Sequence, residues 1–316
     1  MTEYRSCLRC GNRNPVLLKV CQRCGEKLRS AKVSDKTGKR ALRAASALSD
    51  VRDPALQGAE APALEVNKIR CGDCLDILPR MAPDSVDLIV TSPPYNFGLD
   101  EYDTHRDTRS WEDYFAHLNR VWTECARVLK PGGRICVVVQ PMFSDYMPTH
   151  HRVSEQLRGL GLLFKAEILW EKHNWNCKYT AWGSWKSPSM PYLKYTWEFI
   201  EVFCKGSQKK PGISANADIT ADEFKKWVYS RWEIAPENRM KDFEHPSMFP
   251  EEVPDRLIKL FSYKGDLVLD PFNGAGTTTL VAHKLGRGYI GIDISERYCE
   301  IARHRIEELD RQPRLM

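Results

Sequence analysis

Short apolar runs alternate with amphipathic segments along most of the chain. Residues 86–90 and 134–139 are brief apolar runs of the length expected for buried strands. Between them, apolar side chains recur every three or four positions, which predicts a helix carrying Trp111, Phe115, Leu118, Trp122, Cys125 and Leu129. The same reading predicts a helix near 153–160, strands at 166–170, 197–203, 267–270 and 289–293, and a helix from Thr279 to Leu285. This alternation predicts an α/β protein with a doubly wound, mostly parallel sheet that begins near Val66.

Two segments do not follow this alternation. Residues 171–194 mix aromatic, basic and small side chains without a period, and residues 205–244 begin with a basic run and continue polar. Aromatic rings interleaved with lysines suit a surface that stacks bases and contacts phosphates. For any single tryptophan the alternative is packing inside a long insertion. The candidates for nucleic-acid contact are Trp175, Lys178, Trp182, Trp185 and Lys186.

Four of the eleven cysteines form two Cys-x-x-Cys pairs near the start of the chain, each followed by glycine. Two such pairs suit four thiolates arranged tetrahedrally around zinc. We therefore predict a structural zinc ribbon over residues 1–28, with the ligands Cys7, Cys10, Cys21 and Cys24. The alternative is a pair of disulfides in an exported protein, which the polar, basic N-terminus disfavours. Residues 29–64 have little apolar periodicity and are predicted to be a basic, flexible linker.

A strand that runs into two prolines is the most informative local feature. Thr91-Ser92-Pro93-Pro94-Tyr95 directly follows the apolar run 86–90, and two prolines allow neither strand nor helix to continue. The backbone must leave the sheet as a stiff, extended loop. The Ser92 hydroxyl and the Pro93 carbonyl are then two acceptors beside the aromatic ring of Tyr95, a combination that suits a planar base with an exocyclic amine. The alternative is a proline-rich turn that only ends a strand.

A glycine loop follows the apolar run 267–270. Its two glycines, Gly274 and Gly276, allow close approach of a ligand where a helix begins at the threonines. The next strand ends on Asp293, about 20 residues after the loop, at the spacing of a carboxylate that binds ribose hydroxyls. The full G-x-G-x-x-G pattern is absent, which disfavours a dinucleotide site.

Together these motifs resemble the amino-methyltransferases of DNA, which transfer a methyl group from S-adenosyl-L-methionine to an exocyclic amine. The resemblance covers roughly residues 65–306, the predicted catalytic domain. Because the Ser-Pro-Pro-Tyr motif precedes the Phe-x-Gly-x-Gly motif, the chain is similar to the circularly permuted β class. The resemblance implies that the segments at 171–194 and 205–244 are target-recognition regions. It implies catalytic roles for Ser92, Pro93, Pro94 and Tyr95, and cofactor binding by Asp73, Asp270, Phe272, Asn273, Gly274, Gly276, Thr277, Thr278, Asp293 and His245.

The resemblance also favours a target base. In this family serine at the first motif position is commoner in enzymes that act on cytosine N4, whereas aspartate or asparagine is commoner in enzymes that act on adenine N6. Ser92 therefore favours the N4 amine of a cytosine flipped out of duplex DNA. No cysteine stands in the Pro-Cys context of enzymes that attack cytosine carbon, which favours direct transfer to nitrogen. The remaining alternatives are an RNA or protein methyltransferase and an inactive zinc-ribbon DNA-binding protein.

Composition and charge give further expectations about the localisation of the protein and its partners. No apolar run approaches the ~18 residues that a membrane span needs, and the net charge of +5 is mild. We therefore expect a soluble, cytoplasmic protein of a prokaryote or virus, associated with the nucleoid. It is expected to be a monomer or homodimer, with a restriction endonuclease as a possible genetic partner.

Overall fold

The computed structural model describes residues 4–6, 13–15, 64–96, 109–141, 147–173, 187–191, 193–238 and 248–311. The chain divides into two compact units, Met1–Ala61 and Pro62–Met316, close to the predicted start of the catalytic domain. In the first unit, β1 (Tyr4–Ser6) pairs antiparallel with β2 (Arg13–Pro15). Outside the described residues lie the predicted zinc ligands Cys7, Cys10, Cys21 and Cys24, the candidate DNA contacts Trp175, Lys178, Trp182, Trp185 and Lys186, and His245.

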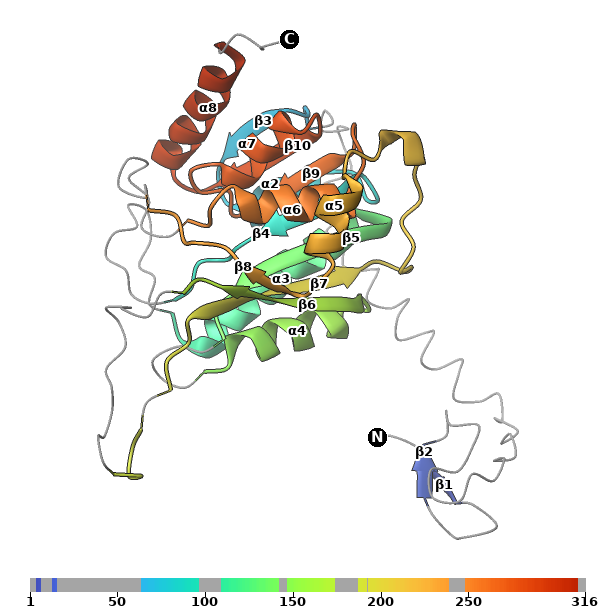
Figure 1. The fold of residues 1–316 in the computed structure, drawn as a ribbon, viewed down its shortest axis with the longest axis vertical. Helices are drawn as coiled ribbons and strands as arrows, with labels where there is room; N and C mark the ends of the chain where they lie inside the picture. Colours follow the sequence, from blue (N-terminus) through green and yellow to red (C-terminus); the bar gives the residue numbers. More distant parts are fainter. Residues whose placement is uncertain are drawn as a thin grey trace, which may run out of the picture. The chain divides into compact units, whose positions relative to one another are not determined.

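The second unit is built on an eight-stranded sheet with the order β3-β10-β9-β4-β5-β7-β6-β8 (Figure 1). Its strands are β3 (Lys68–Cys71), β4 (Val86–Thr91), β5 (Leu129–Val139), β6 (Leu163–Glu171), β7 (Trp197–Cys204), β8 (Arg231–Glu233), β9 (Leu267–Asp270) and β10 (Gly288–Asp293). Within this sheet only β7 runs antiparallel to its neighbours, β5 and β6. The predicted mostly parallel sheet is therefore confirmed for the described residues.

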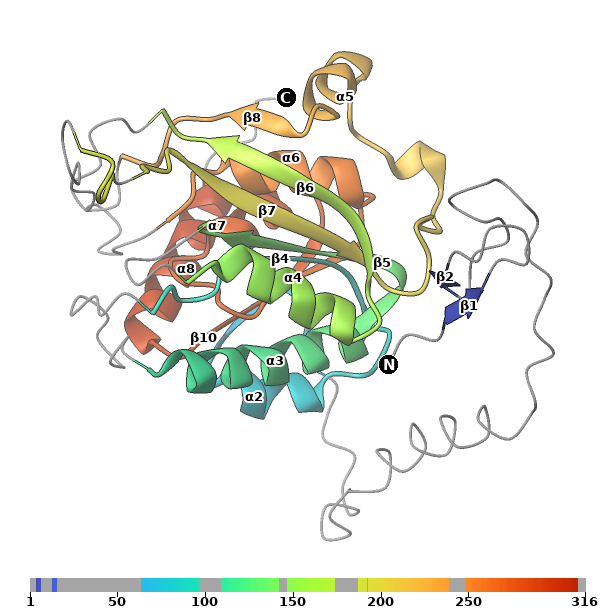
Figure 2. The ribbon, with the colours of Figure 1, turned by 90° about the horizontal axis from the view of Figure 1, so that it is seen from below.

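Helices cover both faces of the sheet (Figure 2). One face carries α2 (Cys74–Ile77), the short turn η2 (Leu78–Arg80), α3 (Trp111–Val128) and α4 (Thr149–Gly159). The other face carries α6 (Glu252–Phe261), α7 (Thr277–Lys284) and α8 (Glu296–Arg311). Because helices cover both faces of this mostly parallel sheet, the central strand β4 is buried at all six positions.

Two of the predictions that differ from the structure have a clear physical reason. The helix was expected to include Leu129, but α3 ends at Val128 and β5 starts at Leu129, where Pro131 biases Lys130 toward extended backbone. The segment 205–244 was placed outside the sheet, but after η3 (Ser214–Asn216) and α5 (Ala221–Trp227) it supplies β8, which pairs in parallel with the end of β6. A three-residue strand with one buried side chain, Trp232, is too short to show a period.

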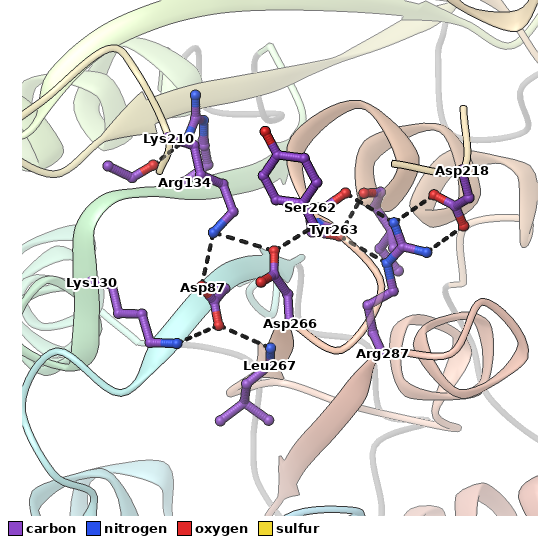
Figure 3. A network of polar contacts seen from close by, with 12 residues as sticks. Asp87, Lys130, Arg134, Lys210, Asp218, Ser262, Tyr263, Asp266, Leu267 and Arg287 are labelled. Carbon is purple, nitrogen blue, oxygen red and sulfur yellow. Dashed lines mark hydrogen bonds and ion pairs between the residues drawn. The ribbon is translucent and has the colours of Figure 1, made fainter. Parts of the chain in front are cut away.

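Ion pairs fasten the amino ends of the central strands (Figure 3). The buried Asp87, on β4, accepts hydrogen bonds from Lys130 at 2.6 Å, Lys210 at 2.8 Å and the Leu267 amide at 3.1 Å. Burial opposes ionisation of Asp87, but the bonds from both lysines outweigh it and hold its pKa below the usual value. Lys205 likewise pairs with Asp84 at 2.7 Å. Two lysines of the basic run at 205–210 thus fasten this segment to the sheet.

Candidate active site

The Ser-Pro-Pro-Tyr loop leaves β4 at the carboxyl edge of the sheet, as the two prolines dictate. Its extended backbone is fixed from outside by Tyr114 of α3, which donates a 2.8 Å hydrogen bond to the Pro94 carbonyl. The loop lines a cavity of about 190 Å³. Ser92, Pro93, Pro94 and Tyr95 all contribute to the cavity wall, so the residues that carry the predicted acceptors and the aromatic ring line one space.

A chain of hydrogen bonds runs from this loop to β7. The Ser92 hydroxyl donates to the Tyr95 oxygen at 3.1 Å, and the Tyr95 hydroxyl donates to Glu198 Oε2, also at 3.1 Å. The other oxygen of Glu198 accepts from Lys172, whose ammonium also lies 4.6 Å from the centre of the Trp170 ring. Glu198, Lys172 and Trp170 line the cavity as well.

The glycine loop joins β9 to α7 and forms a second part of the cavity wall. Gly276 precedes α7 with φ of 82°, and a Cβ there would lie 2.6 Å from the Cβ of Ala302. From α8, the buried Arg305 donates to the Ala275 carbonyl at 2.6 Å and to the Thr277 hydroxyl at 3.3 Å. The loop therefore needs glycine at 276 both for its backbone angle and for its packing against α8.

Asp270 joins the two loops. Its Oδ1 accepts from the Thr91 hydroxyl at 2.6 Å and from the Phe272 amide at 3.0 Å. Complete burial raises the pKa of Asp270 to about 6, and the bonds from Thr91 and Phe272 limit the rise. Because Thr91 immediately precedes Ser92, this carboxyl fixes the Ser-Pro-Pro-Tyr loop relative to the glycine loop.

Two further carboxylates lie where β3 and β10 end side by side. Asp293 pairs in register with Cys71, and the Gly72 amide donates to the Asp293 carbonyl at 2.8 Å. The Asp293 carboxylate accepts from the amides of Gly274 at 2.7 Å and Ser295 at 2.9 Å. Asp73 caps α2 by accepting from the Leu75 amide at 2.8 Å. Both aspartates line the cavity, together with Ile294.

The structure separates the other predicted cofactor residues into two groups. Phe272, Asn273, Gly274 and Thr277 line the cavity, whereas Gly276 and Thr278 do not. The buried Thr278 donates to the Val90 carbonyl at 3.3 Å and so shapes the loop from behind.

Asn273 serves partly as a support. Its side-chain oxygen accepts from Thr279 at 2.9 Å, and its amide packs where a Cβ on Gly291 would approach to 2.6 Å. This side chain therefore fixes the loop against β10.

Among the residues that sequence reasoning missed, Trp170, Lys172 and Glu198 line the cavity and Arg305 braces the glycine loop. A signal existed for Glu198, because a carboxylate within the apolar run 197–203 is rarely buried without partners. Its partners could not be named, since Tyr95 lies 103 residues away along the chain.

The cavity suits S-adenosyl-L-methionine by its donor and acceptor set. A carboxylate oxygen has two lone pairs, so the Asp293 oxygens that accept backbone amides are also able to accept ribose hydroxyls. Ile294 and Phe249 offer apolar surface for a flat base, and Asp73 offers an acceptor for its amine. Acidic side chains also suit a ligand that carries a positive sulfonium.

Neither a metal cluster nor a membrane segment is found in the described part of the chain. No group of three or more His, Cys, Asp or Glu side chains that could hold a metal ion occurs among these residues. None of the helices in the same ranges has the length and apolar character required to cross a membrane.

Comparison with known proteins shows the family to which the chain belongs. Residues 86–304 match the N6/N4 methyltransferase family, described as DNA methylase. The Type II methyltransferase M.HpaI of Haemophilus parainfluenzae is 31% identical over 241 residues, which cover 76% of this chain and 74% of the relative. The Type II methyltransferase M.MjaI of Methanocaldococcus jannaschii is 31% identical over 279 residues, covering 76% of this chain and 91% of the relative.

Solved structures agree with this placement. A protein of Thermus thermophilus, assigned as a DNA modification methylase and solved with S-adenosyl-L-methionine, is 28% identical with a TM-score of 0.61. The match covers 76% of this chain and 93% of that one. The PvuII DNA methyltransferase (cytosine-N4-specific) shares the fold, with a TM-score of 0.57 at 17% identity over 77% of this chain and 87% of that one.

The mixed sheet and its two loops therefore define an S-adenosyl-L-methionine-dependent methyltransferase. More narrowly, the chain belongs to the N6/N4 family of DNA methylases.

Proposed function

We propose that this protein methylates the N4 amine of cytosine in duplex DNA at a specific sequence. The observation that supports this most directly is the shared cavity wall, which Ser92 and Pro93 form together with the glycine loop and Asp293. Serine at the first motif position favours cytosine N4 over adenine N6. Adenine N6 is the second candidate, because either acceptor is able to bind either amine.

The chemistry follows from two acceptors and a fixed position. The lone pair of a base amine is delocalised into the ring, so the amine is a poor nucleophile. Acceptance of its two hydrogens by Ser92 Oγ and the Pro93 carbonyl would favour a tetrahedral nitrogen and stabilise the positive charge that develops on it. The cofactor supplies the electrophilic methyl group, and the cavity contributes mainly by alignment.

A paired base cannot reach this cavity, because its amine is stacked and hydrogen-bonded inside the duplex. The target nucleotide would therefore be flipped out, with the ring of Tyr95 as its stacking surface. Trp175, Lys178, Trp182, Trp185 and Lys186 are the residues proposed to contact the duplex. The Type II relatives M.HpaI and M.MjaI suggest a companion restriction endonuclease.

Residues 1–28 are proposed to form a zinc ribbon, and the order of the two motifs supports the proposal that the chain is of the permuted β class. One zinc per chain is expected at Cys7, Cys10, Cys21 and Cys24. A Cys10→Ser/Cys21→Ser protein should lose the metal and bind DNA less tightly, while its affinity for S-adenosyl-L-methionine stays unchanged. Elemental analysis that finds no zinc in the purified protein would contradict the assignment.

The proposed reaction is tested by its product. Purified protein, duplex DNA and S-adenosyl-L-methionine are incubated, and the digested nucleosides are identified by mass spectrometry. N4-methylcytosine is expected, and N6-methyladenine would assign the second candidate with the same acceptors. A methyl group on cytosine carbon would overturn the mechanism, and methylation of RNA or protein in place of DNA would overturn the substrate.

A further inference from the structure

A buried carboxylate in the cavity wall belongs to neither sequence motif. Glu198 lies on β7, opposite Trp170 of β6, and its side chain is 5% exposed. Burial of a charge is costly unless it is paired and hydrogen-bonded. Here one oxygen accepts from Lys172 and the other accepts from Tyr95. The carboxylate is thus a fixed end point for the hydrogen bonds that begin at Ser92.

These hydrogen bonds can run in one direction only. The carboxylate of Glu198, ion-paired to Lys172, has no proton to give, so Tyr95 donates its single hydroxyl proton to Oε2 at 3.1 Å. The Tyr95 oxygen then accepts from Ser92 at 3.1 Å, and this bond uses the only proton of the Ser92 hydroxyl. Ser92 Oγ therefore has only lone pairs to offer to a group bound in the cavity.

We propose that Glu198, acting through Tyr95, makes Ser92 an obligate acceptor and thereby selects a base with an exocyclic amine over one with an oxo group at that position. An amine donates to Ser92 Oγ and the Pro93 carbonyl, whereas an oxo oxygen would place an acceptor against two acceptors. A site built for a hydrogen-bond donor rejects a group that leaves its buried partners unpaired. This inference rests on the proposed function, because it assigns a base to the cavity.

Two substitutions interrupt the series of hydrogen bonds from Ser92 through Tyr95 to Glu198 at different points. Tyr95→Phe removes the hydroxyl that accepts from Ser92, so the serine proton is free to turn toward the cavity. Glu198→Gln replaces the carboxylate by an amide that is able to donate to Tyr95, which permits the bonds to reverse. Glu201→Gln is the matched control, because Glu201 is also buried on β7 but bonds Ser154 of α4 at 2.7 Å and does not line the cavity.

The experiment compares binding of two DNA duplexes. The methylated sequence is first read from the DNA of a host that expresses the wild-type protein and lacks other methyltransferases. Duplexes are then made with the target base carrying its amine or the matching oxo group: cytosine against uracil, or adenine against hypoxanthine. Dissociation constants are measured by fluorescence anisotropy with saturating S-adenosylhomocysteine, and thermal unfolding and cofactor affinity serve as folding controls.

Wild-type protein and Glu201→Gln should bind the amine duplex at least about tenfold more tightly than the oxo duplex. In Tyr95→Phe and Glu198→Gln this ratio should fall by about tenfold, with cofactor affinity unchanged. An unchanged ratio in both variants, or an equal fall in Glu201→Gln, overturns the proposal. A wild-type protein that methylates no DNA amine overturns the proposed function itself, which separates the two failures.

Discussion

Thr91 Oγ1 donates a 2.6 Å hydrogen bond to Asp270 Oδ1, joining residues that lie 179 positions apart in the chain. Thr91 ends β4 immediately before the Ser-Pro-Pro-Tyr loop, and Asp270 ends β9 immediately before the glycine loop. The carboxyl ends of neighbouring parallel strands meet at one edge of a sheet, which places both loops at one cavity. This buried bond fixes the position of the Ser-Pro-Pro-Tyr loop relative to the glycine loop.

Replacement of Thr91 by valine should test that connection. Thr91→Val keeps the shape of the side chain but removes a donor to the buried Asp270, so the free energy of unfolding should fall by about 1–3 kcal/mol. The pKa of Asp270 should rise further, because the Thr91 bond favours its ionised form. Urea unfolding measures the loss, with Thr123→Val as the control, since the exposed Thr123 bonds only the Asn119 carbonyl of its own helix at 2.7 Å. Equal unfolding midpoints for the two variants would show that the bond contributes little.

Arg305 should control cofactor affinity without being part of either motif. Its bonds to the Ala275 carbonyl and the Thr277 hydroxyl brace the glycine loop from α8. Arg305→Met should weaken binding of S-adenosyl-L-methionine by about tenfold, because the loop loses two bonds that pre-organise it. Calorimetry measures the affinity. Arg311→Met, at an exposed arginine of the same helix that pairs with Glu307, should bind as the wild type does; the same affinity in both variants would contradict the bracing role.

Asp87 should make the free energy of unfolding depend on pH in the acidic range. Its lowered pKa means that its stabilising contribution is present above its unfolded pKa, about 4, and is lost as pH falls through its folded pKa. Asp87→Asn should therefore cost about 2–3 kcal/mol at pH 7, since it leaves the buried Lys210 with Asp266 alone. The deficit should shrink as the pH falls below about 4. Urea midpoints at pH 7 and pH 3 provide the measurement, and a deficit that does not change with pH would contradict it.

Glu201 should change the pH dependence of stability in the opposite direction. Burial raises its pKa to about 8, with a further contribution from Glu167, while Ser154 lowers it. A raised pKa favours folding below the unfolded value, about 4.3, and this stability is lost as pH rises toward 8. Wild type should thus lose stability between pH 5 and pH 8 relative to Glu201→Gln, and the difference should level off above pH 8. The free energy of unfolding of both proteins is measured at pH 5, 7 and 9. A difference between wild type and Glu201→Gln that is the same at all three values would contradict the raised pKa of Glu201.

Local stereochemistry explains why both loops were visible in the sequence. Two prolines after an apolar run end a strand wherever they occur, and Gly274 and Gly276 mark a turn that other residues do not form easily. The apolar periods also predicted α3, β4, β7 and β10 close to their observed limits. These features depend on neighbouring residues, so the sequence alone determined them.

Strand order and register were decided only by the tertiary structure. The antiparallel direction of β7 places Glu198 beside Tyr95, and the pairing of β4 with β9 places Thr91 beside Asp270. Neither contact has a local signal, because a two-residue period states which face a side chain occupies but not which strand lies next to it. The sequence therefore determined the two loops and the class of fold, while long-range packing decided which buried groups surround the proposed site of the target amine and how their hydrogen bonds run.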